Sequence, residues 1–192
     1  PNAGTGTPNA IYWTNNQTAS HALNLDAAAG NAINFYDPLL ADSGVTLTVT
    51  KTGDGEVAFY GDNGASTNYN SLSSSTTNTT VNGGTFTVGN SAAYGNAAAG
   101  TFTLSSGAML KGSNNGTLRA AAIRLNNGSG LTVSGGTLAL DSASIALGSA
   151  ANGIINLTGY GTLNASSNLN AAYSGTSVAA NIGTDGSSNS YT

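Results

Sequence analysis

The chain has 192 residues and a formal net charge of −4, but only 6% of its residues are charged, against about 25% in a typical soluble domain. Its four basic residues are scattered, which excludes the concentrated positive charge that nucleic-acid binding needs. There is no run of about 18 apolar residues that would predict a membrane-spanning helix. Cysteine is absent, which fits both cytosolic and exported proteins, whereas the abundance of Asn, Ser and Thr favours an extracellular protein.

The first segment, residues 1–44, is predicted to form an N-terminal cap and the first coils of a repetitive fold. Its opening, PNAGTGTPNA, lacks the basic and apolar regions of a signal peptide, which indicates a mature or excised piece of a longer protein. Tyr12 and Trp13 are expected to cover the open end of the fold, because exposed strand edges invite further pairing.

A loose repeat begins later in the same segment. It starts at Gly30, and Ile33 and Phe35 are its predicted inward-facing pair. Pro38 has a fixed backbone and keeps Asp37 extended, which suits a sharp exit from a strand.

A related phrase recurs through residues 45–182. It reads TTVNGGTFTV at 79–88, LTVSGGTLAL at 131–140 and IINLTGYGTLNA at 154–165. The copies share a glycine, namely Gly55, Gly84, Gly107, Gly136 and Gly161. Two positions after each glycine stands an apolar residue that is predicted to face inward: Val57, Phe86, Met109, Leu138 and Leu163. A second predicted inward set is Val81, Leu104, Val133 and Leu157.

Within each copy, apolar residues alternate with Thr, Asn, Ser or Ala, which predicts strands with one buried face. Frequent Asn-Gly pairs suit the hairpins of an antiparallel sandwich, but they also suit the turns of a parallel β-helix. The pattern returns only after two or three strands, which favours the β-helix. One such coil cannot offset its own conformational entropy, so coils must stack. We therefore predict an all-β parallel β-helix with coils of about 23–29 residues and outward columns of Thr and Asn.

Two segments are predicted to lie outside the coils. The stretch 62–80 is rich in Ser, Thr and Asn and predicts a long loop, a kind of segment that often carries binding. Residues 183–192 form a polar tail typical of a chain cut within a longer protein.

Two motifs of the chain resemble the passenger-associated repeat of bacterial autotransporters. KTGDGEVAFYG (51–61) is followed, after a Ser/Thr-rich stretch, by VNGGTFTVG (81–89). NAINFYDPLL (31–40) also resembles the segment that precedes such repeats in AIDA-like and pertactin-like passengers. The resemblance covers about residues 31–165.

The resemblance implies a right-handed parallel β-helix that is exported through the periplasm and an outer-membrane β-barrel translocator. It implies display on a Gram-negative cell surface, or release from it, in adhesion, self-association or biofilm formation. The stretch in hand would be part of the shaft or its N-terminal end.

Few residues suggest catalytic chemistry. His21 is the only histidine, and a Ser-His-Asp triad would have to combine it with Ser20 and with Asp26 or Asp37. No Gly-x-Ser-x-Gly elbow accompanies it, and a surface or capping role is the simpler interpretation. One histidine without cysteine also excludes a histidine-based metal cluster.

The acidic and basic residues give two weaker candidates. Asp54 and Glu56 would share one face of a strand near Asp62 and could serve acid–base catalysis or bind calcium, although a turn and an outward strand position explain them as well. Arg119 and Arg124 could share a surface, but no carboxylate follows them until position 141. We predict no catalytic, cofactor-binding or metal-binding residues.

Scattered tyrosines could stack on sugars, although single exposed tyrosines usually have no such role. The candidates are Tyr60, Tyr69, Tyr94, Tyr160 and Tyr173.

The leading functional hypothesis is a non-enzymatic adhesin, which binds itself or a host or glycan ligand through its outward polar faces. A purely structural shaft is the first alternative, and a polysaccharide-active β-helix enzyme is the second. Ice binding is the third, because TLTVT (46–50) and TFTV (85–88) suggest a Thr-x-Thr face. The variable spacing of the coils is expected to disturb the registry that ice binding requires.

Overall fold

A computed structural model describes the backbone of residues 11–13, 20–36, 39–60, 72, 75–89, 92–113, 115–126, 129–142, 144–147, 154–165, 169–170, 179–182 and 190–191. Side chains are described only between Ser20 and Ser142, with gaps. The strands in these residues are β1 (Ile11–Trp13), β2 (Ser20–Asp26), β3 (Ala32–Phe35), β4 (Leu39–Ala41), β5 (Thr46–Thr52), β6 (Glu56–Tyr60), β7 (Thr76–Val81), β8 (Thr85–Gly89), β9 (Ala93–Leu104), β10 (Met109–Ser113), β11 (Gly116–Leu125), β12 (Gly130–Asp141), β13 (Ser144–Leu147), β14 (Ile154–Ala165), β15 (Leu169–Asn170), β16 (Ala179–Ile182) and β17 (Ser190–Tyr191).

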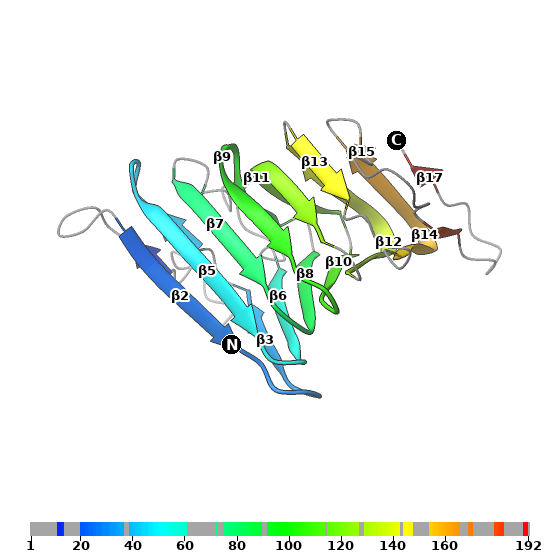
Figure 1. The fold of residues 1–192 in the computed structure, drawn as a ribbon, viewed down its shortest axis with the longest axis horizontal. Helices are drawn as coiled ribbons and strands as arrows, with labels where there is room; N and C mark the ends of the chain where they lie inside the picture. Colours follow the sequence, from blue (N-terminus) through cyan, green and yellow to red (C-terminus); the bar gives the residue numbers. More distant parts are fainter. Residues whose placement is uncertain are drawn as a thin grey trace, which may run out of the picture.

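The strands stack in parallel into a β-solenoid, which confirms the predicted parallel β-helix. Face 1 consists of β2, β5, β7, the second halves of β9 and β11, then β13 and β15. Face 2 consists of β3, β6, β8, β10, the first halves of β12 and β14, and β16. Face 3 consists of the other halves of β9, β11, β12 and β14, with β17. Figure 1 shows face 1 as one row of arrows, running from β2 in blue to β13 in yellow.

The phrase LTVSGGTLAL, with its central glycine pair, forms a corner between two faces. Residues 130–134 of β12 pair with β10 on face 2, and residues 138–141 pair with β11 on face 3. The register against β14 shifts between Ser134 and Gly136. The glycines therefore allow one strand to turn a corner of the solenoid and to supply two of its faces.

The coils differ in length, yet within each face their strands stay in register. The step from Phe102 to its partner Ile123 is shorter than the shortest predicted coil. The step from Thr46 to its partner Thr76 is longer than the longest predicted coil. Turns and loops between the faces take up the difference, so the expectation that variable spacing would disturb the registry is wrong.

One predicted inward residue is wrong by a single position. Met109 pairs with Thr85 on the outer side of face 2, whereas Leu110 pairs with Phe86 and is fully buried. The cause is a longer turn, because Ala108 stands between Gly107 and the strand and its N–H donates to Ser105 O at 3.1 Å. Since side chains alternate in a strand, one extra residue moves each of them to the other face.

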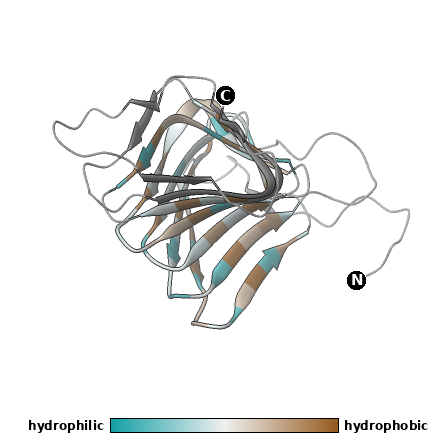
Figure 2. Cartoon of the chain, turned by 90° about the vertical axis from the view of Figure 1, so that its right-hand side faces the viewer, coloured by the Kyte–Doolittle hydropathy of each residue, from teal (hydrophilic) through white to brown (hydrophobic). Residues whose placement is uncertain are grey.

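The core is a narrow stack of apolar columns, and brown and teal bands alternate along the strands in Figure 2. Ile33 and Phe35 pack against it as predicted. Phe59 lies at the centre of an aromatic group, with its ring centroid 4.7 Å from those of Phe35 and Tyr94 and 5.2 Å from that of Phe86. Aromatic pairs at such distances stabilise a core beyond the area that they bury.

The predicted loop over 62–80 ends earlier than expected, because its last residues form β7. Thr77 and Thr79 of β7 face inward and are buried, and their hydroxyl groups have hydrogen-bond partners. Thr79 Oγ1 lies 2.8 Å from the hydroxyl oxygen of Tyr94. A strand with threonine on both faces lacks the apolar alternation by which strands are identified, which explains the error.

The turn KTGDG connects β5 to β6 within one coil and contacts the coils on both sides. Lys51 points inward from β5 with no exposed surface, and its Nζ donates to Gly53 O at 2.5 Å and to Gly83 O at 2.6 Å. Gly53 has a φ of 73°, and a Cβ there would overlap the carbonyl oxygen of Ala27 in the preceding coil. The Lys-x-Gly pattern therefore has a structural role in bringing coils close together.

The stack begins well inside the predicted N-terminal segment, since β2 pairs with β5 along its whole length. Tyr12 and Trp13 pair through their backbones with β4, and their predicted role as a cover lies outside the described side chains. The predicted strand exit at Asp37 and Pro38 also lies outside the described residues. Within the described residues, no helix is long and apolar enough to cross a membrane.

Candidate binding surfaces

The outer side of face 1 carries a regular array of uncharged polar groups, which we call the threonine face. It consists of outward side chains of β5, β7 and the second half of β9: Thr46, Thr48, Thr50, Thr76, Asn78, Thr80, Thr101 and Thr103. Inward neighbours such as Val49 and Phe102 are buried, so alternation requires these groups to point outward.

Strand register places the hydroxyl groups in columns. Thr50 pairs with Thr80, and Thr80 pairs with Thr103. Neighbouring strands of a sheet lie about 4.8 Å apart, and alternate residues of one strand lie about 6.7 Å apart. The threonine face is therefore a two-dimensional grid of groups that both donate and accept hydrogen bonds.

Side-chain hydrogen bonds connect the coils at this surface and beside it. Asn78 Oδ1 accepts from Thr101 N at 3.1 Å and from Thr101 Oγ1 at 3.3 Å. At the ends of the strands, Thr52 Oγ1 donates to Asp26 Oδ1 at 3.0 Å, and Ser105 Oγ donates to an oxygen of the preceding coil. Such bonds restrict the rotamers of surface groups and reduce the entropy cost of binding a partner.

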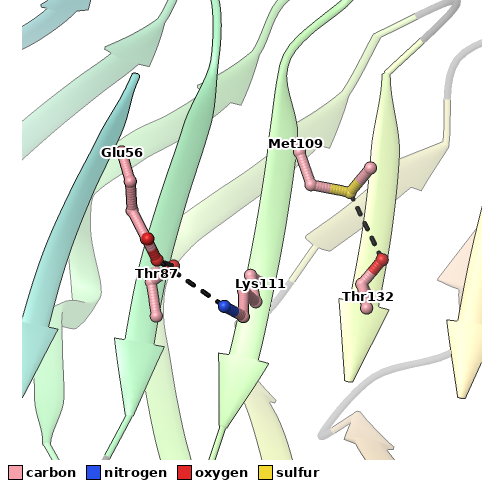
Figure 3. Close-up of polar contacts among 5 residues, drawn as sticks. All are labelled: Glu56, Thr87, Met109, Lys111 and Thr132. Atoms are coloured by element: carbon pink, nitrogen blue, oxygen red, sulfur yellow. Dashed lines mark hydrogen bonds and ion pairs between the residues drawn. The ribbon is translucent and has the colours of Figure 1, made fainter. Parts of the chain in front are cut away.

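The outer side of face 2 differs, because it carries a charge cluster (Figure 3). Thr87 Oγ1 donates to Glu56 Oε1 at 2.5 Å, and Lys111 Nζ lies 3.8 Å from the same oxygen. Glu56, Thr87 and Lys111 come from the neighbouring strands β6, β8 and β10. Beside them, Thr132 Oγ1 donates to the sulfur of Met109 at 3.4 Å. A carboxylate is thus held in place by partners from two later coils.

Two tyrosine rings lie on the same side of face 2. Tyr36 directly follows β3 and Tyr60 ends β6, and their ring centroids are 5.5 Å apart in a stacked arrangement. Burial raises the pKa of Tyr60 above its usual value, and the carboxylate of Glu56 and the neighbouring Tyr36 raise it further. Glu56 and Tyr60 stand four residues apart in β6 and on the same side of it, so the tyrosine pair and the charge cluster share the outer side of face 2.

The structure separates the two acidic candidates. Asp54 lies in the bend before β6, where its charge opposes the lowering of the pKa of Lys51 that burial causes. Glu56 contacts Thr87 and Lys111 instead. Asp62 lies outside the described residues. Among the described residues, no three His, Cys, Asp or Glu side chains gather as potential metal ligands.

The other candidates are also dispersed. Ser20 and His21 are adjacent in β2 and so point to opposite faces of the strand. Arg119 and Arg124 belong to different faces of the solenoid, because β11 turns a corner between Ala120 and Ala122. The predicted shared surface of the two arginines is therefore wrong.

The tyrosine candidates have different positions. Tyr94 is buried in the core, where burial raises the pKa of its hydroxyl strongly, so it is not a surface residue. Tyr60 is half-buried on the outer side of face 2, as a surface role requires. The side chains of Tyr69, Tyr160 and Tyr173 lie outside the described residues.

Sequence reasoning missed the partners of Glu56 and Tyr60. Tyr36 and Tyr60 are separated in the sequence by the same number of residues as the paired residues Ala32 of β3 and Glu56 of β6. The two tyrosines therefore stand at equivalent positions of successive coils, and this separation could have identified the pair. The contact of Lys111 with Glu56 joins strands two coils apart and gives no comparable signal.

In comparisons with known proteins, no family model, curated sequence or solved structure matches this chain.

Proposed function

We propose that this chain is a surface-displayed autotransporter passenger segment that acts without catalysis, by self-association through the threonine face. The resemblance of 51–61 and 81–89 to passenger-associated repeats supports the passenger assignment. The proposed location is the cell surface of a Gram-negative bacterium or its surroundings, after export by a β-barrel translocator.

The threonine face is the observation that carries the proposal. Its groups are uncharged and both donate and accept hydrogen bonds, so one copy is chemically complementary to another. Because the threonines of successive coils are in register, the columns offer the same contact at each coil. Repeated weak contacts give a high combined affinity even though each is weak. With a net charge of −4, two copies repel each other only modestly, and salt reduces that repulsion.

The test is sedimentation of the purified chain over a range of micromolar concentrations, at low and high salt. We expect reversible self-association that salt does not weaken. The double variant Thr48→Lys/Thr103→Lys places like charges opposite each other in the contact, and it should weaken association about tenfold or more.

The matched control is Asn34→Lys/Thr132→Lys, which adds the same charge to the outer side of face 2. It should associate like the original chain. A strict monomer at every concentration would refute self-association by this segment and leave the structural shaft as the explanation. Equal effects of both double variants would show that net charge, rather than the threonine face, controls association.

Ice binding is a second candidate, and one observation favours it. The threonine columns keep their register although the coils differ in length, which removes the sequence-based objection. A rigid grid of hydroxyl groups can order water at its surface. Ice recrystallisation assays on the chain and on Thr48→Lys/Thr103→Lys test this candidate. Inhibition of recrystallisation by the original chain, but not by the double variant, would establish it.

A further inference from the structure

The tyrosine pair lies on the outer side of face 2 and is not part of the hydrophobic core. Tyr36 has 56% of its surface exposed, and no other large apolar side chain among the described residues is exposed. Its ring stacks on that of Tyr60, with an angle of 23° between the ring planes. Stacking fixes the orientation of an aromatic surface that remains open to solvent.

The charge cluster lies beside this aromatic surface on the same strand. Glu56 and Tyr60 point outward from β6, and the small side chain of Ala58 between them is fully covered by its neighbours. The Glu56 carboxylate is held by the buried hydroxyl of Thr87, and its side chain is 30% exposed. The Lys111 side chain is 38% exposed, so both charged groups can reach a ligand.

We propose that Tyr36, Tyr60, Glu56 and Lys111 form a binding site for a short, neutral saccharide. A tyrosine ring presents a flat apolar surface to the C–H groups of a sugar ring. The carboxylate accepts hydrogen bonds from sugar hydroxyl groups, and the ammonium group donates to their oxygens. This site is separate from the threonine face, and it does not depend on self-association.

The charges at the site select a neutral ligand. Glu56 and Lys111 compensate each other, so the cluster carries no net charge that would attract an acidic glycan. Their separation of 3.8 Å leaves each with hydrogen-bonding capacity for a ligand. The Tyr60 hydroxyl stays protonated at neutral pH, because its pKa lies above the usual value, and it adds an uncharged donor.

The distance between the two parts indicates a ligand of more than one sugar ring. Four residues of a strand separate Glu56 from Tyr60, which places their Cα atoms about 13 Å apart. An oligosaccharide is long enough to stack on the tyrosines and also reach the charge cluster over a backbone span of this length.

The experiment applies the whole chain to an array of neutral glucose, mannose, galactose and N-acetylglucosamine oligosaccharides, with sialylated and sulfated ones included. Retained sugars are then titrated calorimetrically. We expect neutral oligosaccharides to be retained, with affinity that changes little with salt. Tyr36→Ala should lower the affinity at least tenfold, Tyr36→Phe should preserve it, and Glu56→Gln should lower it by roughly tenfold.

Thr48→Lys/Thr103→Lys is the control, since it disrupts the threonine face and should bind sugar normally. Retention of no sugar would overturn the proposal, as would retention of acidic sugars alone with a strong salt dependence. Unchanged binding by Tyr36→Ala would overturn it too. Circular dichroism checks that each variant is folded, and the exposure of Tyr36 makes its replacement harmless to the core.

Discussion

Lys51 illustrates how one residue joins two coils. Its ammonium group donates to carbonyl oxygens of Gly53 and Gly83, which belong to successive coils. Burial lowers the pKa of Lys51, while Asp54 and Asp26 act in the opposite direction. A buried charge is stable only when it is well compensated, and removal of one partner leaves the other groups unsatisfied.

We predict that Lys51→Met lowers the free energy of unfolding by about 2–4 kcal/mol, because two partly buried carbonyl oxygens lose a charged donor. Chemical denaturation followed by circular dichroism measures the change. Lys111→Met is the matched control and should cost less than about 1 kcal/mol, since its ion pair is solvent-exposed. A Lys51→Met variant as stable as the original would mean that apolar packing fully replaces the two hydrogen bonds.

Tyr94 is a second residue whose environment has a measurable consequence. It is enclosed by the rings of Phe59 and Phe86 and bonded to Thr79, and burial raises the pKa of its hydroxyl. Above about pH 10 the unfolded chain releases this proton, whereas the folded chain retains it. The folded state then binds more protons than the unfolded state, so stability falls as pH rises.

We predict that Tyr94 contributes a loss of about 1.4 kcal/mol of unfolding free energy per pH unit above pH 10. Tyr94→Phe lacks the titrating group, so its stability should decline less steeply than that of the original chain between pH 10 and 11.5. Denaturation curves at closely spaced pH values measure both slopes. Identical slopes would show that Tyr94 ionises in the folded protein.

At the scale of elements, turns decide how closely coils approach. Gly53 and Gly107 both have a positive φ, 73° and 79° respectively. A Cβ at Gly53 would overlap the backbone of the preceding coil, whereas a Cβ at Gly107 would meet nothing within 4 Å. Substitutions at the two glycines can therefore distinguish the stability cost of the backbone conformation from the stability cost of steric overlap.

We predict that Gly107→Ala costs about 1–2 kcal/mol of stability, which is the penalty of a left-handed conformation alone. Gly53→Ala should cost clearly more, because the turn that holds Gly53 and the turn of the preceding coil at Ala27 must also move apart. Thermal and urea unfolding of the two variants measure the difference. Equal losses would show that the coils can separate at Gly53 without appreciable cost.

Element-level patterns in the sequence were informative only where apolar and polar residues alternate. The pattern predicted the strands that carry Val57, Phe86 and Leu104, and it predicted Val81 at the end of β7. It failed for the rest of β7, where Thr77 and Thr79 face inward. It also failed at Met109, where a turn longer by one residue reversed the alternation. For the candidate sites, it predicted outward threonine columns but not the contacts of Glu56.

At the scale of the whole molecule, a solenoid is stabilised mainly by contacts between neighbouring coils. Within the described residues, β2 and β3 end the order of paired strands, whereas β8 pairs with β6 on one side and β10 on the other. The first coil also retains partly exposed apolar side chains, including Leu23 and Ile33. Local opening should therefore be easiest at this end.

We predict a gradient of amide hydrogen exchange along the stack. Exchange should be fastest in β2 and β3, and slowest in β8 and β10, because the central strands must break pairings on both sides to open. Exchange measured by mass spectrometry on peptides from each strand tests this. Uniform protection from β2 to β10 would instead indicate that the solenoid opens only as one cooperative unit.

By itself, the sequence determined the parallel solenoid, the alternation of buried and exposed residues and the threonine columns. These features depend only on the two-residue alternation within strands and on a phrase that recurs once per coil. Only the tertiary structure decided which residues of different coils meet. Glu56 contacts Lys111, and Gly112 occupies a column position where Val88 and Val133 stand because a Cβ there would overlap Leu138. The physical reason is that turn lengths, which vary by whole residues, set the register between coils, and a shift of one residue changes every lateral contact.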